Sequence, residues 1–295
     1  MRTSRTLPAL AGLVAVTALA GCVAPPAGPA PAEPAPAPTI ADAAQLPVAA
    51  DGEMPPRLNL DGPPSLEDVE EFLVAVIEDA DAVWTEYFLG SGLREPVLEY
   101  VIVQPGDEPF VSNCGYDEPI VMESDTRNAF FCSLDGSLDA EGEPVGAILF
   151  AVETMQAMWT GSAFGMPIEV GGDFGAALVV AHEFGHHITH ELGTQLDAPP
   201  LGHVMWFELM ADCFAGNWTA TAYAKGALET GDLEEAGAVL AVIGDAPGIV
   251  DHGTAEQRTE AFLLGYQGDA EFGGGDPNAC VSTYWRSDDP TASGE

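Results

Sequence analysis

The chain has 295 residues, with 8 lysine and arginine residues against 47 aspartate and glutamate residues, so its formal net charge is -39 at pH 7. Such an acidic surface repels nucleic acid and anionic lipid headgroups, so we expect no nucleic-acid partner. The acidity suits a salty medium, in which self-repulsion is screened, although general solubility explains it equally well.

Residues 1–22 are typical of an export leader. Two arginines give a positive start, and the apolar run at 7–20 is too short to span a bilayer comfortably. The run ends in Leu-Ala-Gly-Cys, which resembles the lipobox of bacterial lipoproteins, so we expect Cys22 to be lipidated and to become the N-terminus. The lipid would anchor the protein on the extracytoplasmic side of the membrane, in the cell envelope. The alternative is an ordinary secretory signal cut near Ala20, which gives a secreted protein.

The segment 23–56 alternates proline with alanine, which favours polyproline II and cannot build a core. We therefore expect a tether that reaches at most on the order of 100 Å when fully extended. Residues 57–286 suffice for one domain with a full core, and residues 287–295 form a polar tail that we expect to be disordered. Under these predictions the lipid is the domain's only contact with the membrane.

Hydrophobic periodicity within 57–286 predicts a mixture of helices and strands. The pattern also predicts a loop over 104–119. We expect strands at 97–103, 129–132 and 147–152, and helices at 65–89, 153–159, around 177–192, from 203 past 218, at 232–243 and at 254–265.

Residues 181–187 read Ala-His-Glu-Phe-Gly-His-His and contain the motif His-Glu-x-x-His. Because His182 and His186 are four residues apart, they lie one above the other on a helix face, which suits two ligands of one zinc ion. Glu183 is then placed to act as general base on a metal-activated water. The short motif arises by chance in roughly one chain of this length in a hundred, so it does not decide the function alone.

A second helix carries Glu208 and Asp212, which are four residues apart and share a face. Large apolar side chains crowd this helix, so we expect it to be buried, and buried carboxylates need partners. A catalytic zinc takes three protein ligands and one open position. Glu208 is the best candidate for the third ligand, and Asp212 is suited to accept the free N–H of His182. This ligand set is that of the gluzincins.

Other ligand sets fit the sequence less well. Thr189 and Leu192 stand where the metzincin pattern needs glycine and histidine, which excludes that class. His190 lies in line with both ligand histidines on one helix, and three ligands in line cannot surround a tetrahedral ion. We expect His187, His190 and His203 to be structural or exposed.

Besides Cys22 the chain has four cysteines, an even number for an exported protein, which indicates two disulfides. Of the three possible connectivities we favour Cys114–Cys132, which closes a short loop between neighbouring strands, together with Cys213–Cys280. The rival interpretation is a structural zinc site, but the chain contains no Cys-x-x-Cys pair.

Three stretches in order resemble the bacterial neutral zinc metallopeptidase family. They are Gly-Asp-Phe at 172–174 leading into the His-Glu-x-x-His segment, Glu-Leu-Met-Ala-Asp-Cys-Phe-Ala-Gly at 208–216, and His-Gly-Thr-Ala-Glu-Gln-Arg at 252–258. The similarity runs from about 129 to 280. It implies an α+β, zincin-like fold of the gluzincin type, with a small sheet packed on the active-site helix and a mainly helical C-terminal part. It also implies one zinc ion per chain and hydrolysis of a peptide or protein substrate.

The chain departs from the family pattern at two places near the expected substrate-lining edge strand. Ser133 stands where the family has proline after the cysteine, and residues 135–144 form an acidic insertion. Both departures bear on specificity more than on catalysis.

The family motif also includes His252, which precedes a predicted helix start. We expect it to donate a hydrogen bond to the tetrahedral oxyanion; the alternative is that it caps or packs against the helix. Arg258 either binds a substrate carboxylate or pairs with a neighbouring acid. A second class of function stays open, namely a catalytically silent, zinc-stabilised interaction module of the cell envelope. The presence of Glu183 favours the peptidase.

Overall fold

The computed structural model describes residues 5–6, 63–115, 118–140, 142–246 and 249–289. The predicted leader lies outside these residues except for a two-residue strand, and so do Cys22 and the predicted tether. Among the described residues no helix is long and apolar enough to cross a membrane.

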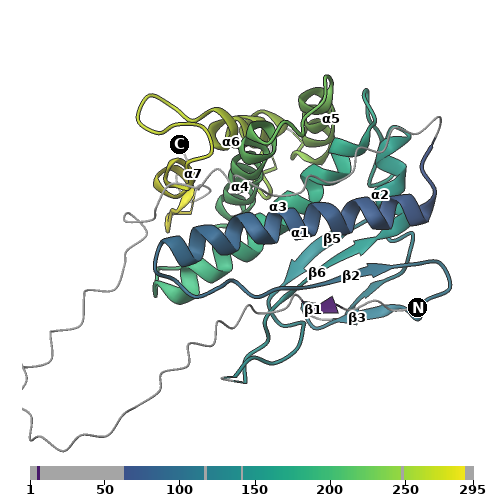
Figure 1. Cartoon of the computed structure of the whole chain (residues 1–295), viewed down its shortest axis with the longest axis horizontal. Helices are drawn as coiled ribbons and strands as arrows, with labels where there is room; N and C mark the ends of the chain where they lie inside the picture. The colour runs from purple at the N-terminus through teal and green to yellow at the C-terminus, as the bar shows by residue number, and fades with distance from the viewer. Residues whose placement is uncertain (1–4, 7–62, 116–117, 141, 247–248, 290–295) are drawn as a thin grey trace, which may run out of the picture.

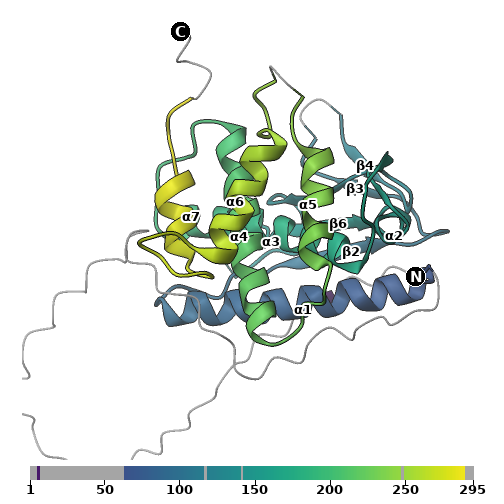
Figure 2. The same ribbon diagram turned by 90° about the horizontal axis from the view of Figure 1, so that it is seen from above.

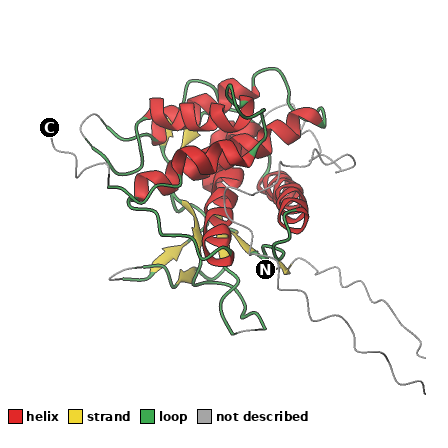
Figure 3. Ribbon diagram, turned by 90° about the vertical axis from the view of Figure 1, so that its left-hand side faces the viewer, coloured by secondary structure: helices red, strands yellow, loops and turns green. Residues whose placement is uncertain are grey.

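A small sheet lies on one side of the molecule and a group of helices on the other, with the two longest helices, α1 and α3, between them (Figure 1; Figure 3). The mixed α+β fold is thus confirmed. Viewed from above, α6 lies between α7 and α5 and packs against α4 (Figure 2). The described helices are α1 (Leu66–Gly90), α2 (Val152–Trp159), α3 (Asp173–Gln195), α4 (Val204–Ala224), α5 (Asp232–Ile243), α6 (Ala255–Gln267) and α7 (Pro277–Tyr284).

The main sheet has the strand order β1-β2-β6-β5, from β1 (Arg5–Thr6), β2 (Glu99–Val103), β6 (Ala147–Ala151) and β5 (Ala129–Cys132). Strand β2 runs parallel to β6, whereas β5 runs antiparallel to β6 and forms the edge of the sheet beside α3. Since β1 falls in the predicted leader, removal of the leader would leave the main sheet with the three strands β2, β6 and β5.

Strand β6 is buried on both faces, which explains its continuous apolar sequence. Ile148 and Phe150 belong to the main core beneath the helices. Ala147, Leu149 and Ala151 face a smaller core that includes Met122 of β4. The alternation follows from the two-residue period of a strand.

Two short hairpins accompany the sheet. One pairs β3 (Phe110–Ser112) with β4 (Ile120–Met122), and the other pairs β7 (Ser162–Ala163) with β8 (Met166–Pro167). The prediction of a loop over 104–119 was therefore wrong in part, because β3 lies inside it. Strands of three residues among proline, glycine and asparagine are too short to give a periodic signal.

Local capping explains where several helices begin. In α1, Ser65 and Asp68 form the predicted capping box, in which each side chain accepts a hydrogen bond from the other residue's backbone N–H, at 2.8 and 3.2 Å. Thr254 and Gln257 form the same box on α6. The prediction missed α7, which begins with Asp276 as N-cap and Pro277 in its first turn.

Part of the segment that we expected to be a disordered tail is described in the structure after α7. Residues 287–289, expected as part of the disordered tail, are described, and the carbonyl of Asp288 accepts a hydrogen bond of 2.8 Å from Trp206 Nε1. The Arg286 guanidinium also pairs with the Asp288 carboxylate at 2.9 Å. These contacts tie the segment to α4; residues 290–295 lie outside the described part.

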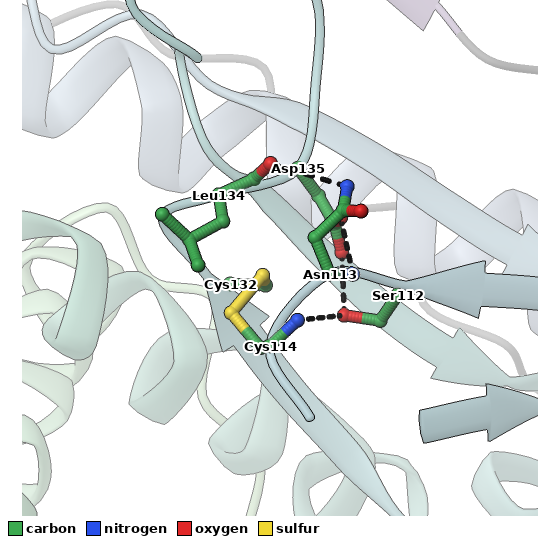
Figure 4. Close-up of a disulfide and its surroundings, with 6 residues drawn as sticks. All are labelled: Ser112, Asn113, Cys114, Cys132, Leu134 and Asp135. Atoms are coloured by element: carbon green, nitrogen blue, oxygen red, sulfur yellow. Dashed lines mark hydrogen bonds between the residues drawn. A yellow bond between two sulfur atoms is a disulfide. The ribbon is translucent and has the colours of Figure 1, made fainter. Parts of the chain in front are cut away.

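Both predicted disulfides, Cys114–Cys132 and Cys213–Cys280, are present. The first joins the segment after β3 to the end of β5 (Figure 4). Beside it the buried Asp135 carboxylate accepts hydrogen bonds from Ser112 Oγ at 2.6 Å and from the backbone and side chain of Asn113 at 2.9 and 2.8 Å. The first residue of the predicted acidic insertion therefore fixes the end of the edge strand. The second disulfide ties α4 to α7.

Candidate metal centre

Helix α3 carries His182, Glu183 and His186 through the middle of the molecule, so all three side chains are buried. The helix begins without a side-chain cap of its own. Instead, Glu235 on α5 accepts a hydrogen bond of 3.0 Å from the backbone N–H of Phe174. A carboxylate at this end also complements the helix dipole, so α5 fixes the start of the helix.

Glu208 on α4 faces both histidines of the motif. Its Oε2 lies 3.3 Å from His182 Nε2, and its Oε1 lies 3.6 Å from His186 Nε2. His182, His186 and Glu208 each offer one ligand atom, and these three atoms all lie within 4.8 Å of one another. The structure thus brings together the three residues that the sequence predicts as metal ligands.

The donor set and its spacing suit zinc. Two imidazole nitrogens and one carboxylate oxygen form a known catalytic zinc set, with bonds of about 2.0–2.2 Å. Tetrahedral bonds of that length place the ligand atoms about 3.4 Å apart, close to the two observed separations of 3.3 and 3.6 Å. Residues His182, His186 and Glu208 would therefore fit a zinc ion, and all three line the cleft.

Asp212 lies one turn after Glu208 and is fully buried. Its Oδ1 is 2.8 Å from His182 Nδ1, so the ring presents Nε2 toward Glu208. Arg258 on α6 donates to the same carboxylate from Nε at 2.7 Å and from Nη2 at 2.9 Å. Of the two roles considered for Arg258, the structure favours pairing with a neighbouring acid.

Close helix packing makes these contacts possible. A methyl group on Gly185 would stand 2.6 Å from the Cα and carbonyl oxygen of Ala211, so only glycine lets α3 and α4 approach this closely. Gly265 has the same role between α6 and α4, because a methyl group there would collide with the carbonyl of Cys213. The two glycines bring Glu208 to the histidines and Arg258 to Asp212.

The electrostatics of the site keep the ligands ready for a cation. Burial lowers the pKa of His186 to about 3, so this ring is neutral and its lone pair is free to bind a metal. Burial also opposes the charge on His182, but the Asp212 carboxylate outweighs it and raises the His182 pKa to about 10. Burial likewise opposes the charge on Glu208, but the two histidines hold its pKa below the usual range. A cation at Nε2 of His182 would therefore displace a proton from this ring.

Glu183 lies beside the ligands in the same cleft. Burial raises its pKa to about 7, which is near the value that suits a general base at neutral pH. Its Oε2 has no hydrogen-bond partner among the described residues. The residue lines the cleft, so its carboxyl group borders the space that a water or a substrate would enter.

The cleft has a volume of about 480 Å³ and lies between the edge strand β5 and helices α3, α4 and α5. Its walls are largely apolar. They include Phe130 and Phe131 of β5, Phe164 and Met166 of the β7–β8 hairpin, and Leu240 and Ile243 of α5. A pocket along the edge strand of a sheet can admit an extended peptide.

A family model described as "Putative neutral zinc metallopeptidase" matches residues 57–283. The chain belongs to this family. The protein YpfJ of Escherichia coli K12 is 28% identical over 249 residues, which cover 76% of this chain and 74% of YpfJ. Rv2575 of Mycobacterium tuberculosis H37Rv is 30% identical over 234 residues, 70% of this chain and 68% of Rv2575. Both carry the description "Uncharacterized protein", and no solved structure matches the chain significantly.

Within this member of the zinc metallopeptidase family, the other histidines stand apart from the ligand group. His252 lines the cleft, is 49% exposed, and has its Nδ1 at 3.5 Å from Asp251 and 3.7 Å from Asp245. His187 is buried, with its Nε2 at 3.1 Å from the carbonyl of Pro96. His203 caps α4 by accepting from the backbone N–H of Met205, and His190 is exposed.

Sequence reasoning missed several residues of the site. Phe207 stacks on the His186 ring at a centroid distance of 4.6 Å and so restrains the orientation of this candidate ligand. Its position directly before Glu208, on a helix rich in aromatic residues, was the signal available. Arg127 and the β7–β8 hairpin also line the cleft, and no motif marks them.

Proposed function

We propose that this protein is a zinc-dependent peptidase of the gluzincin type, with one zinc ion held by His182, His186 and Glu208. The observation that carries the proposal is the meeting of these three ligand side chains with the buried carboxylate of Glu183 in one open cleft. The family match supports the zinc and the class of reaction. A peptide or protein is the substrate that suits a cleft along an exposed strand edge.

In this proposal each residue has a defined task. Zinc, when bound, lowers the pKa of water to about 7 and polarises the scissile carbonyl. Glu183 accepts a proton from the attacking water at its carboxylate and later delivers it to the leaving amine. Asp212, held by Arg258, keeps the proton of His182 on Nδ1, so that Nε2 stays free as a ligand.

His252 is our candidate for the donor that stabilises the tetrahedral oxyanion. It lines the cleft, and its ring lies against Asp251 and Asp245. The Asp245 carboxylate also accepts three backbone N–H bonds of 2.8 Å from residues 251–253, which holds the segment in place. The other cation beside the ligands, Arg258, pairs with Asp212 and lies 3.5 Å from Glu208.

The replacement Glu183→Gln tests the proposal against the alternative of a silent, zinc-stabilised interaction module. The variant keeps the size of the side chain but cannot accept a proton. We expect it to retain zinc and fold while losing about 10²–10⁴-fold in the rate of peptide cleavage. Cleavage of a peptide library with and without chelator is the measurement, and His190→Ala is the control on the same helix. Absence of cleavage by the parent protein, or equal cleavage by the Glu183→Gln variant, would overturn it.

We further propose that the domain is anchored at the extracytoplasmic face of the membrane through a lipid on Cys22. The lipobox-like residues 19–22 and the proline-rich segment behind them support this location. The variant Cys22→Ser should be released from the membrane fraction or stay unprocessed. Fractionation and migration identical to the parent would contradict the anchor and favour the secreted alternative.

A further inference from the structure

Arg127 is an unpaired cation at the cleft of a strongly acidic protein. The chain has only 8 basic residues against 47 acidic ones, and acidic residues pair with most of the basic ones that the structure describes. Lys225 pairs with Asp79, Arg258 with Asp212 and Arg286 with Asp288. Arg127 lines the cleft just before β5, and within the described ranges it makes no ion pair or hydrogen bond.

The structure holds Arg127 in place from both sides. In the turn before it, Thr126 Oγ1 accepts a hydrogen bond of 2.8 Å from the backbone of Glu123, and the Thr126 carbonyl accepts one of 2.9 Å from Thr154 on α2. The Arg127 side chain lies flat against Gly165 in the β7–β8 turn, where an added Cβ would stand 2.7 Å from its Cδ, Nε and Cζ atoms. The guanidinium is thus positioned beside Phe164 and Met166, which line the cleft.

The other charged groups of the cleft are already occupied. His182, His186 and Glu208 form the ligand group, and Asp212 and Arg258 neutralise each other. Glu183 serves the reaction in the proposed function. A peptide in the cleft therefore meets one cation that nothing in the described structure neutralises. A guanidinium of this kind forms two parallel hydrogen bonds with a carboxylate, which makes it selective for that group.

We propose that Arg127 determines specificity by binding a carboxylate of the peptide substrate, supplied by an acidic side chain or by the free C-terminus. The proposal rests on the proposed peptidase function. Phe131, whose backbone lies against Glu183, is four residues further along the chain. At about 3.3 Å per residue, Arg127 lies at most about 13 Å from that point. The carboxylate would thus be a few residues from the scissile bond.

Because of the charge of the whole protein, this preference should depend on where in the peptide the carboxylate lies. A net charge of -39 repels acidic peptides at long range, so several carboxylates on one peptide bring no general advantage. One carboxylate placed opposite Arg127 gains a local partner that neutral peptides lack. The structure therefore predicts a preference at one position of the peptide and none elsewhere.

A scan of a neutral peptide tests this prediction. One glutamate is placed at each position in turn, with glutamine at the same position as the matched neutral peptide, and each sequence is also made as free acid and as C-terminal amide. Fluorescence anisotropy gives the dissociation constants for the full chain carrying Glu183→Gln and loaded with zinc. Steady-state assays of the parent chain give kcat/KM for the same peptides.

We expect glutamate to bind about 5-fold to 20-fold more tightly than glutamine at one position, or the free acid to show that advantage over the amide. An advantage in the glutamate–glutamine pair identifies an acidic side chain as the source of the carboxylate, and an advantage in the acid–amide pair identifies the C-terminus. Arg127→Gln should abolish the advantage, and Arg127→Glu should replace it with a preference for lysine at the same position. Arg94→Gln makes the same change of charge on an exposed arginine outside the cleft and should keep the preference.

Equal binding of every glutamate and glutamine pair and of every acid and amide pair would overturn the proposal. A preference that survives Arg127→Gln would overturn it as well. The binding measurement separates the two proposals, because it does not require hydrolysis. A binding preference without any cleavage would contradict the peptidase function and support the Arg127 site. Cleavage without a preference would support the peptidase function and contradict the Arg127 site.

Discussion

Arg258 binds Asp212 with two hydrogen bonds of 2.7 and 2.9 Å, and both side chains are buried. The same carboxylate lies 2.8 Å from Nδ1 of His182. These contacts link α6, α4 and α3 and end at His182, a proposed metal ligand. The arginine also lies directly beside the site, because its Nη2 is 3.5 Å from Glu208 Oε2.

Removal of the Arg258 side chain should be among the most damaging single changes in the protein. Arg258→Ala leaves the Asp212 charge buried without its cation, and breaking a buried pair in this way typically lowers the free energy of unfolding by about 3–5 kcal/mol. Arg258→Lys keeps the charge but not the two parallel bonds, so an intermediate loss is expected. Urea unfolding measures both. A loss below about 1 kcal/mol for the alanine variant would contradict the role assigned to the pair.

Zinc content should distinguish Glu208 from Asp212. Glu208→Ala removes a proposed ligand and should lose most of the bound zinc. Asp212→Asn disturbs only the orientation of His182, so we expect a smaller loss, of about 10–100-fold in affinity. Elemental analysis after extensive dialysis gives zinc per chain. His190→Ala, an exposed histidine on the ligand helix, is the matched control. Full zinc in the Glu208 variant would remove that residue from the ligand set.

Asp81 should make the protein less stable as the pH rises. Burial, together with repulsion from Glu95 and Glu78, raises the pKa of Asp81 from 3.8 to about 7. A raised pKa means that the folded state favours the protonated carboxyl, so this stability is full below pH 3.8 and is lost as the pH approaches 7. Asp81→Asn should therefore stabilise the fold at pH 8, by on the order of 2 kcal/mol, and change little near pH 4.

The measurement for Asp81 is denaturant unfolding of parent and variant at both pH values. Glu95→Gln provides a second variant, because it relieves part of the repulsion without touching Asp81. It should give a smaller gain in the same pH range. An equal effect of Asp81→Asn at pH 4 and pH 8 would show that the carboxyl does not titrate as described.

The two disulfides should differ in their effect on stability. Cys213–Cys280 spans 67 residues and Cys114–Cys132 spans 18, and the entropy removed from the unfolded chain grows with the length of the closed loop. Replacing Cys213 and Cys280 by alanine should cost about 3–5 kcal/mol, more than the same change at Cys114 and Cys132. Thermal unfolding under non-reducing conditions compares the pairs. A larger loss for the shorter loop would contradict this order.

Local signals in the sequence predicted much of the fold. The capping boxes at Ser65 and Thr254 and the helical periods behind them predicted α1 and α6 to within two residues, because such signals depend only on neighbours in the chain. The structure places α5 at Asp232–Ile243, as predicted. Strand β3 and helix α7 were missed because each is short, and tertiary contacts rather than a periodic pattern stabilise them.

The same distinction applies to the site. The spacing of His182 and His186 reports a helix face, and the shared face of Glu208 and Asp212 reports another, so each pair could be recognised within one helix. That Arg258 reaches Asp212 depends on how closely α6 and α4 pack, which the motif around Arg258 does not reveal. Arg127 carries no motif at all, and its significance appears only once the ion pairs of the other cations are known.

The order in which a ribosome makes the chain gives the Asp212–Arg258 pair a further consequence. Both histidines, Glu183 and Glu208 are synthesised first. Arg258, which pairs with Asp212, follows that residue by 46 positions, and Cys280 follows Cys213 by 67 positions. A growing chain that already holds every proposed ligand thus still lacks the charge and the crosslink that keep α4 in place. A product truncated before Arg258 would therefore carry the His-Glu-x-x-His motif without the cation that pairs with Asp212.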